Sequence, residues 1–329
     1  MDKKPLISVI IPVYNLGREI IPTLDSVCGQ SYGHLQIVVV NDGSTDDSLR
    51  IVREYAARDS RIAVVDKPNE GLALARRSGL ERAEGDYIHH LDGGDILAPG
   101  AYELLVDTLR SNGFPDVVMF EFRYRFADGR TSDSCSYPFP EGWTDSMEML
   151  RHIWFTQNCH STLQYLHRRS LACELHFDSR LSLGEDLYYT TQLLYRAGRV
   201  WLLHARLFDY VQDAGSMTRC GRYSDRAVES TLLFPELVYD FMRDKPEFES
   251  VQKELLVIRL VAYLLLIRMG RRERMKMMVT EIRRACQQYP ELRSHREIHF
   301  LRKLLALYGR FPLLYRIELW HYRREGKVL

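Results

Sequence analysis

Short apolar runs rich in β-branched residues alternate with amphipathic stretches in the first 90 residues, and this alternation restricts the fold more than any other feature. The apolar runs cover residues 7–13, 36–40, 61–65 and 87–91. The stretches between them, with apolar residues at helical spacing, cover residues 19–28, 46–57 and 71–83. Near-continuous apolar strands separated by helices are typical of a parallel sheet covered on both faces. The sequence therefore predicts an α/β fold with a mostly parallel sheet flanked by helices.

A weaker form of the same pattern continues to about residue 224. Helices are expected at 100–111 and 146–155 and from Glu185, a strand at 116–124, and irregular structure between that strand and the second of these helices. From Asp225 onward all apolar patterns have helical spacing. We expect the helices there to be interrupted by prolines, namely Pro235, Pro246, Pro290 and Pro312. The sequence thus predicts an α/β domain over residues 1–224 and a basic helical region over residues 225–329.

Charge is unevenly distributed although the whole chain carries a formal net charge of only +1. From Val251 to the end there are 18 Lys and Arg against 7 Asp and Glu, so the first 250 residues are acidic. Basic and aromatic residues are interspersed between 300 and 327, which fits a helix lying on an anionic membrane. A helical subdomain that packs on the rest of the chain or on a second copy fits equally well. No motif supports nucleic-acid binding.

Targeting signals and cysteines favour a cytoplasmic location. The apolar run at the N-terminus contains Pro12 and lacks a small-residue cleavage site, so we interpret it as a buried strand rather than a signal peptide. The longest apolar stretch, residues 255–267, contains Arg259 and is shorter than the ~20 residues that span a bilayer. Six scattered cysteines without a CxxC pair indicate reduced thiols. Peripheral attachment at the inner face of the membrane is the alternative location, through the basic tail.

Polar and acidic residues follow three of the expected strands. The first strand ends in PVYN, the second in NDGSTD and the fourth in DGGD. In parallel sheets, ligands bind beyond the carboxyl ends of the strands. Carboxylates after two separate apolar strands favour a site for a cation or for a group that donates hydrogen bonds.

Five motifs in order resemble the inverting family 2 glycosyltransferases. They are SVIIPVYN, VVVNDGSTDDS, NEGLALARRSG, GDYIHHLDGGD and GEDLYYTTQLL, and the resemblance covers about residues 6–218. It implies the GT-A fold over the first domain. It also implies transfer of a sugar from a nucleotide sugar, with a UDP-sugar favoured, to a hydroxyl of a glycan or lipid-linked acceptor with inversion. Synthesis of a cell-surface polysaccharide is the expected setting, and a nucleotide-sugar-binding protein with impaired catalysis is the alternative.

The resemblance implies that five residues bind the nucleotide-sugar donor. Asp42 would bind the base and ribose, since a carboxylate accepts hydrogen bonds from a uracil N–H or a ribose hydroxyl. Pro12 and Tyr14 would lie near the base, Arg76 would serve the diphosphate, and Asp92 would contact the donor. Ordinary structural roles compete: Asp42 in a turn before a helix, Tyr14 as a packed aromatic, and Arg76 as a solvated helix charge.

Asp186 matches the position of the family's general base, with Glu185 in support. The reaction needs a carboxylate close to the acceptor hydroxyl, so that it takes the proton as the oxygen attacks. Both acids at the start of a helix are also explained by a favourable interaction with the helix dipole.

A divalent metal, Mg²⁺ or Mn²⁺, is the cofactor that the resemblance implies, held by Asp92 and Asp95. Oxygen ligands suit these ions, and such an ion neutralises the leaving diphosphate. The sequence departs from the family at Gly94, where an acid is common, and at Asp213, where histidine is common. Asp213 is therefore a candidate ligand in a relocated site. The scattered histidines, including His89, His90 and His160, are interpreted as packing or polar contacts.

Overall fold

The structure is a computed structural model that describes residues 4–133, 137–156, 161–212, 224–269, 271 and 275–310. The chain divides into two compact units. The first comprises residues 1–150 and 159–213, and the second comprises residues 151–158 and 214–329. The sequence placed the boundary at residue 224 and assigned 151–158 to the first domain, so the helical unit begins earlier than expected and takes in this short segment.

Ten strands of the described residues form one mixed sheet in the first unit. Its main path runs β3-β2-β1-β4-β9-β6-β10-β5, with β7 paired to β6 and β8 to β10. The strands are β1 (Ile7–Val13), β2 (Leu35–Asp42), β3 (Ile62–Lys67), β4 (Tyr87–His90), β5 (Ile96–Leu97), β6 (Val117–Phe126), β7 (Thr131–Asp133), β8 (Gly142–Asp145), β9 (Tyr165–Arg168) and β10 (Arg199–Gln212).

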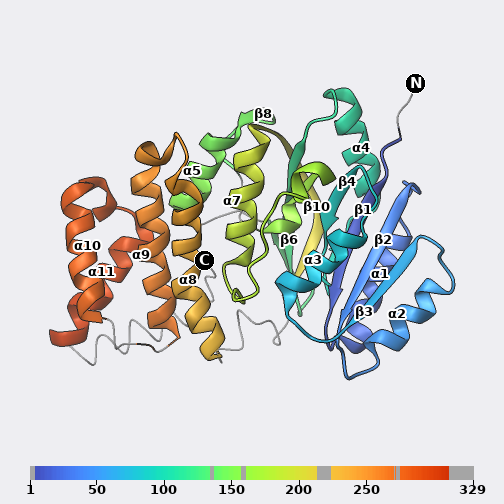
Figure 1. The fold of residues 1–329 in the computed structure, drawn as a ribbon, viewed down its shortest axis with the longest axis horizontal. Helices are drawn as coiled ribbons and strands as arrows, with labels where there is room; N and C mark the ends of the chain where they lie inside the picture. Colours follow the sequence, from blue (N-terminus) through green and yellow to red (C-terminus); the bar gives the residue numbers. More distant parts are fainter. Residues whose placement is uncertain are drawn as a thin grey trace. The chain divides into compact units, whose positions relative to one another are not determined.

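The four parallel strands β3, β2, β1 and β4 lie side by side at one end of the sheet, as the apolar runs predict (Figure 1). β9 interrupts the parallel order because it runs antiparallel to both β4 and β6. The sequence missed β9 and β10, and the region expected to be irregular contains β7 and β8. β10 is hard to recognise because its pairing with β6 shifts register near Arg206, which disturbs the alternation of side chains.

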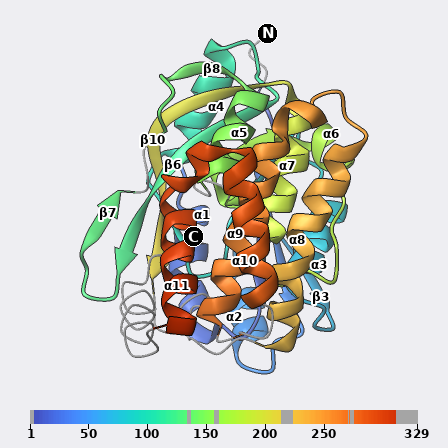
Figure 2. The same cartoon turned by 90° about the vertical axis from the view of Figure 1, so that its left-hand side faces the viewer.

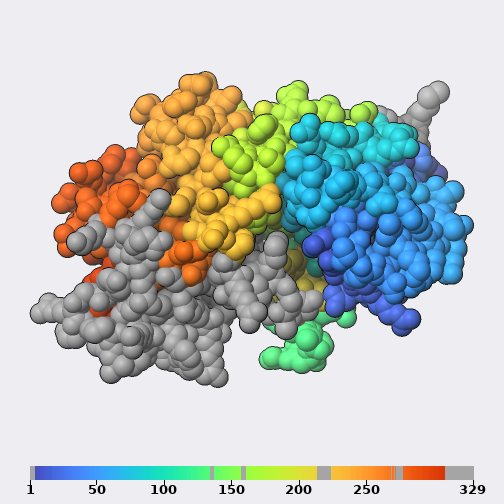
Figure 3. Space-filling view, turned by 60° about the horizontal axis from the view of Figure 1, so that its bottom comes forward, coloured from blue at the N-terminus to red at the C-terminus, as the bar shows by residue number. Residues whose placement is uncertain are grey.

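Helices cover both faces of the parallel strands. On one face, Val9 and Ile11 of β1 pack in a core with residues of α1 (Ile20–Cys28), α2 (Ser48–Ala56) and α4 (Ala101–Ser111). On the other face, Ile10 packs with residues of α3 (Leu72–Arg82) and α6 (Arg169–Ala172). The sheet is therefore buried on both sides, which explains why its strands are apolar throughout. Figure 3 shows the surface of this part of the first unit in blue and cyan.

The remaining elements of the first unit bring further residues to the sheet. They are η1 (Gly17–Glu19), η2 (Thr162–Gln164), α7 (Glu185–Ala197) and the first part of α5 (Ser146–Thr156). Gly184 precedes α7 with a φ of 81°, a conformation that glycine adopts without strain. The helix that the sequence predicted from Glu185 is confirmed.

The second unit is helical in its described part. Its elements are α8 (Asp225–Arg243), η3 (Phe248–Val251), α9 (Gln252–Arg268), α10 (Met275–Gln288), η4 (Pro290–Arg293) and α11 (Arg296–Arg310), and α9, α10 and α11 pack on one another (Figure 2). The break expected at Pro235 is wrong, because this proline is buried inside α8. A proline removes one backbone donor, and the continuous buried side of α8, including Phe234 and Val238, keeps the helix intact.

None of the helices in the described ranges is long and apolar enough to cross a membrane. The basic and aromatic segment between residues 300 and 327 lies mostly beyond residue 310, outside the described residues. Its predicted attachment to a membrane or to a second copy therefore stays a prediction.

Candidate active site

The loops that follow β1 and β2 are tied together at the carboxyl edge of the sheet. Asn15 has a φ of 50°, and its backbone N–H donates to Ser44 Oγ at 3.0 Å. In return, Thr45 N donates to Asn15 Oδ1 at 2.8 Å. Pro12 is buried in β1, whereas the ring of Tyr14 directly after the strand is 52% exposed. An exposed ring at this position is free to stack on a ligand, and its burial in a core is excluded.

Asp42 at the end of β2 is buried and holds the loop that leads into α3. Its carboxylate accepts hydrogen bonds from Lys67 Nζ at 2.8 Å, Glu70 N at 3.0 Å and Gly71 N at 2.8 Å. Only 4% of the side chain is exposed. A carboxylate has about four acceptor positions, so one position is left for a ligand. Sequence reasoning missed Lys67, although a lysine at the end of the third strand signals a cation at this edge.

Arg76 brings three of the predicted residues together. Its Nη1 donates to Asp186 Oδ1 at 2.6 Å, and its Nη2 lies 2.9 Å from Asp92 Oδ1. The guanidinium is only 3% exposed. Burial opposes its charge, but Asp92 and Asp186 outweigh burial and raise the pKa of Arg76. By contrast, the side chain of Arg77 is 57% exposed and pairs with Glu81 on the same helix, so Arg76 is the site residue of the two.

Asp186 lies in the first turn of α7 and, within the described part of the chain, accepts hydrogen bonds through only one of its two carboxylate oxygens. Its Oδ1 accepts hydrogen bonds from Arg76 Nη1 at 2.6 Å and from Thr162 Oγ1 at 3.1 Å. Among the described residues, Oδ2 has no hydrogen-bond partner, and the side chain is 26% exposed. The carboxylate is therefore oriented through one oxygen and able to accept a proton on the other. No sequence pattern indicates Thr162, which lies 24 residues before Asp186.

Glu185 lies beside Asp186 in a region of mutually repelling carboxylates. Burial, together with the charges of Asp186 and Asp92, raises the pKa of Glu185 to about 7, and Arg76 opposes the shift. The side chain thus changes its protonation state near neutral pH. Burial and the neighbouring carboxylates thus favour the neutral, protonated form of this side chain.

The DGGD turn after β4 does not by itself provide a metal site. Gly94 has a φ of 109° and offers no carboxylate, while Asp92 already faces Arg76 with both oxygens. Asp95 is 4% exposed, with Oδ1 accepting from Val211 N at 2.9 Å and Oδ2 buried without a partner. Burial and the nearby Asp92 raise the pKa of Asp95 well above its usual range.

The other acids, histidines and cysteines of the described residues do not complete a metal site either. Within the described ranges, no group of three or more His, Cys, Asp and Glu residues is arranged to hold a metal ion. Asp213, the candidate for a relocated ligand, lies outside the described residues. Asp92 and Asp95 on their own therefore do not fit a complete site for Mg²⁺ or Mn²⁺.

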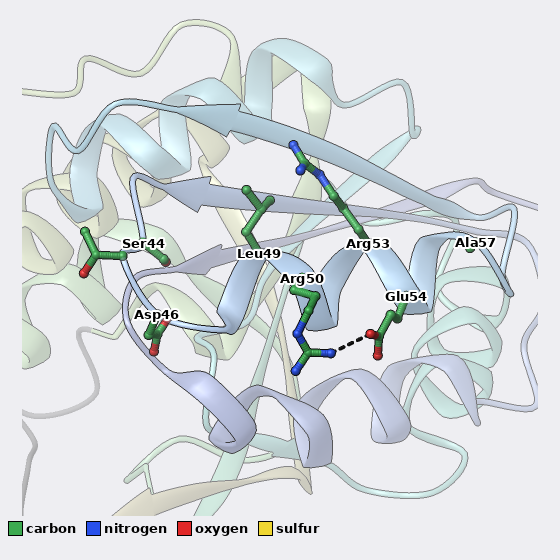
Figure 4. A pocket seen from close by; sticks show the side chains of 8 residues that line it. Ser44, Asp46, Leu49, Arg50, Arg53, Glu54 and Ala57 are labelled. Carbon is green, nitrogen blue, oxygen red and sulfur yellow. Dashed lines mark hydrogen bonds and ion pairs between the residues drawn. The ribbon is translucent and has the colours of Figure 1, made fainter.

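A shallow hollow of about 550 Å³ lies along the outer side of α2, next to the loop after β2. Figure 4 shows that Arg50 and Glu54 on its floor point toward each other, and they form an ion pair of 2.5 Å. Both side chains are at least half exposed, and such pairs contribute little. The hollow contains none of the acids that Arg76 assembles, so it is not the centre of the site.

Residues 8–173 match the family Glycosyl transferase family 2. The chain belongs to this family. It is 32% identical over 218 residues to the "Uncharacterized glycosyltransferase EpsJ" of Bacillus subtilis (strain 168), with 65% of this chain and 63% of that protein covered. The matched region thus spans less than two thirds of that relative. A further match is to "Chondroitin synthase" of Escherichia coli, 35% identical over 112 residues, covering 34% of this chain and 16% of that protein.

The fold of this chain resembles that of a solved structure. The crystal structure of S. aureus TarS 1-349 in complex with UDP-GlcNAc superposes with a TM-score of 0.67, covering 97% of this chain and 92% of that one. The sequences are 20% identical, so this likeness concerns the fold alone. The mixed sheet flanked by helices, followed by a helical C-terminal region, confirms the GT-A fold that the five motifs predicted.

Proposed function

We propose that this chain transfers a sugar from a nucleotide-sugar donor to an acceptor hydroxyl with inversion at the anomeric carbon. The observation that carries the proposal is the pattern of hydrogen bonds to the Asp186 carboxylate. Its Oδ1 accepts from Arg76 and Thr162, and its Oδ2 has no hydrogen-bond partner among the described residues. Membership of the glycosyltransferase family supplies the class of reaction.

The transfer proceeds as a single displacement. The acceptor hydroxyl donates a hydrogen bond to Asp186 Oδ2, which takes the proton as the hydroxyl oxygen attacks the anomeric carbon. The new C–O bond forms as the bond between that carbon and the diphosphate breaks. Both electrons of the broken bond leave with the nucleoside diphosphate. Because attack and departure occur on opposite faces, the configuration inverts.

The charges around Asp186 support this role. The buried guanidinium of Arg76 lies 2.6 Å from Asp186 and places a positive charge beside its carboxylate. The same guanidinium binds Asp92, so the base and the donor-side acid are linked through one cation. Glu185, with its pKa raised to about 7 by burial and the neighbouring carboxylates, adds little competing negative charge.

A UDP-sugar is the proposed donor. The loops after β1 and β2 provide the exposed ring of Tyr14 and the buried carboxylate of Asp42 at one edge of the sheet. Stacking and carboxylate recognition both suit a pyrimidine nucleoside. The likeness to TarS, solved in complex with UDP-GlcNAc, favours the same class of donor. A glycan or lipid-linked acceptor in polysaccharide synthesis is the proposed partner.

Metal dependence is a separate part of the proposal. The described residues supply at most Asp92 and Asp95, so we propose that Asp213 completes the ligand set for Mg²⁺ or Mn²⁺. Such an ion would neutralise charge on the leaving diphosphate. The proton transfer to Asp186 stands independently of it.

The basic tail is proposed to attach the protein to the inner face of the membrane or to a second copy. Its support is the excess of Lys and Arg over Asp and Glu beyond Val251. Flotation of the full chain and of a chain truncated after Val251 with anionic liposomes tests the membrane arm. Equal recovery of both chains contradicts it.

A transfer assay with a panel of nucleotide sugars, using glycan and lipid-linked acceptors, tests the activity. Thermal-shift measurements with the same nucleotides report binding separately. Binding without transfer or hydrolysis supports the second candidate, a nucleotide-sugar-binding protein with impaired catalysis, which the missing carboxylate at Gly94 favours. Neither binding nor turnover with any donor contradicts both.

A further inference from the structure

Two neighbouring histidines of β4 point to opposite faces of the sheet and meet different tyrosines. His89 Nδ1 lies 2.8 Å from the hydroxyl of Tyr102 on α4. His90 Nε2 lies 3.1 Å from the hydroxyl of Tyr189 on α7. His90 pairs in register with Ile10, whose side chain packs with α3, so the second contact lies on the face that carries Arg76.

The Tyr189 hydroxyl also contacts His167 of β9, with 2.9 Å between the hydroxyl and Nε2. All three side chains are buried, with exposures of 0% for both histidines and 4% for Tyr189. The group therefore joins β4, β9 and α7, three elements that are distant in sequence. His90 and Tyr189 lie within two of the five motifs, but the resemblance assigns no role to either side chain, and the acid–base reaction itself does not use this group.

The direction of each hydrogen bond follows from the contacts. His167 Nδ1 faces the carbonyl oxygen of Arg168 at 3.2 Å, and a carbonyl only accepts, so this nitrogen carries a proton. Burial lowers the pKa of His167 to about 4, so the ring is neutral and its Nε2 accepts from Tyr189. Since the only hydroxyl proton of Tyr189 is then used, its oxygen accepts from His90 Nε2–H.

Two members of this chain of hydrogen bonds, Tyr189 and His90, lie close in sequence to acids of the candidate site. Tyr189 is three residues after Asp186, so both side chains lie on one side of α7. His90 is two residues before Asp92, and its Nδ1 is buried without a hydrogen-bond partner. Asp186 and Asp92 are thus linked by two routes. Arg76 contacts both acids directly, and the hydrogen bond between Tyr189 and His90 joins the two elements that precede or carry them.

We propose that Tyr189 is a positioning residue, which with His90 and His167 fixes the first turn of α7 against β4 so that Asp186 Oδ2 faces the acceptor hydroxyl. This inference rests on the proposed function for its effect on turnover. The hydroxyl does not touch the reacting atoms; it acts through the helix. Because a misplacement of about 1 Å costs up to ~10²-fold in rate, loss of this tie lowers turnover without removing the base.

The hydrogen-bond directions are tested first, on the full chain without substrate. ¹⁵N NMR of histidine-labelled protein at pH 7, with signals assigned through His90→Gln and His167→Gln, is expected to show protonated Nε2 in His90 and protonated Nδ1 in His167. Protonated Nδ1 in His90, or rapid exchange of either ring between tautomers, overturns the proposal. This result does not depend on whether the chain is an active transferase.

Turnover is tested by comparing Tyr189→Phe with Tyr102→Phe. Both variants delete one buried tyrosine hydroxyl that contacts a β4 histidine, but only Tyr189 lies on the helix of Asp186. We expect Tyr189→Phe to lower kcat about 10-fold or more, with the Kd for UDP within about twofold of wild type, and Tyr102→Phe to keep kcat within about twofold. Equal kcat in the two variants at matched folded fraction overturns the proposal.

Two substitutions of His90 distinguish a role in positioning Asp186 from a general loss of stability. His90→Gln keeps an N–H close to the place of Nε2, whereas His90→Leu removes it. We expect His90→Gln to retain several-fold more turnover than His90→Leu at temperatures where both are folded, and equal turnover contradicts the role. If the wild-type chain itself transfers no sugar, the proposed function fails, and the NMR result alone decides the network.

Discussion

Arg76 and Asp186 lie 110 residues apart in the chain and form a 2.6 Å ion pair in which the arginine side chain is 3% exposed. The pair uses only Oδ1 of the carboxylate, which also accepts from Thr162. A buried cation that holds one oxygen of a base lowers the freedom of the side chain without occupying the oxygen that receives the proton. This arrangement connects α3 with α7, the helix that carries the proposed base.

Replacement of Asp186 by asparagine is expected to lower turnover by about 10²-fold or more, the usual contribution of general-base catalysis. The variant keeps an oxygen for Arg76 but loses the proton acceptor, so binding of UDP should change little. Steady-state rates and calorimetric titration with UDP measure the two effects. Asp116→Asn, at an exposed ion pair with Arg168, is the matched control, and full activity of Asp186→Asn would end the assignment.

Substitution of the two adjacent arginines of α3 is expected to have very different effects on stability and on kcat/KM. Arg76→Ala leaves Asp92 and Asp186 facing each other without a cation, which should lower stability by about 1–3 kcal/mol and reduce kcat/KM at least about 10²-fold. Arg77→Ala removes only an exposed pair with Glu81, which contributes less than about 1 kcal/mol. Denaturant unfolding and transfer rates check both variants. Similar losses in the two would show that Arg76 has no special role.

Much of this arrangement was predictable because it depends on short-range patterns. Strands β1 to β4 were identified from their apolar residues, and parallel strands place their carboxyl ends at one edge. That rule places Asp42, Asp92 and Tyr14 at this edge from the sequence alone. The resemblance to the family then selected Asp186 and Arg76, and the structure brings these two together with Asp92.

The rest depends on contacts between distant segments. The hydrogen bonds of Asp42 with Lys67, and of Tyr189 with His90 and His167, have no periodic signature in sequence. Sequence reasoning interpreted the histidines of β4 as packing or polar contacts, which fits the contacts of His89 with Tyr102 and Leu163 but does not say which elements His90 connects. β9 escaped recognition because its four residues alone give too short a pattern, whereas the equally short β4 continues the alternation of strands and helices.

Stability should depend on pH through Glu185. Its pKa is about 7 in the folded protein and about 4.3 when unfolded, so the folded state binds the extra proton between these values. The free energy of unfolding therefore falls as pH rises from about 4 to about 7. Glu185→Gln stays neutral and avoids this loss. Relative to wild type, its Tm should rise by about 2–4 °C or more between pH 4.5 and pH 8.

Scanning calorimetry at several pH values without ligands measures this difference. Glu81→Gln, whose carboxylate is 63% exposed and pairs with Arg77, is the control and should show no comparable trend. Titrating groups distant from Glu185 are shared with wild type, so their contributions cancel in the difference. A Tm difference for Glu185→Gln that is the same at pH 4.5 and pH 8 would contradict the raised pKa.

Metal dependence should reveal whether Asp213 replaces the carboxylate that is missing at Gly94. Asp92 faces Arg76 with both oxygens, and Asp95 keeps one buried oxygen without a partner. These two acids need a further ligand to hold an ion. In sequence, Asp213 directly follows Gln212, the last residue of β10, and the Val211 N–H of this strand donates to Asp95. Exchange of an imidazole for a carboxylate hardens the ligand set and should favour Mg²⁺ or Mn²⁺ over softer ions.

Titration of activity with Mn²⁺ tests this relocated ligand. Asp213→Ala should raise the Mn²⁺ concentration for half-maximal activity about 10-fold or more, comparable with the 10–100-fold loss of metal affinity seen for supporting ligand groups. Asp128→Ala, at an exposed ion pair with Arg130, should leave the titration unchanged. Because the base reaction at Asp186 is separate, saturating Mn²⁺ should restore most of the turnover of Asp213→Ala. Full turnover of the wild-type chain in excess chelator would instead show that Arg76 and the helix N-termini suffice for the diphosphate.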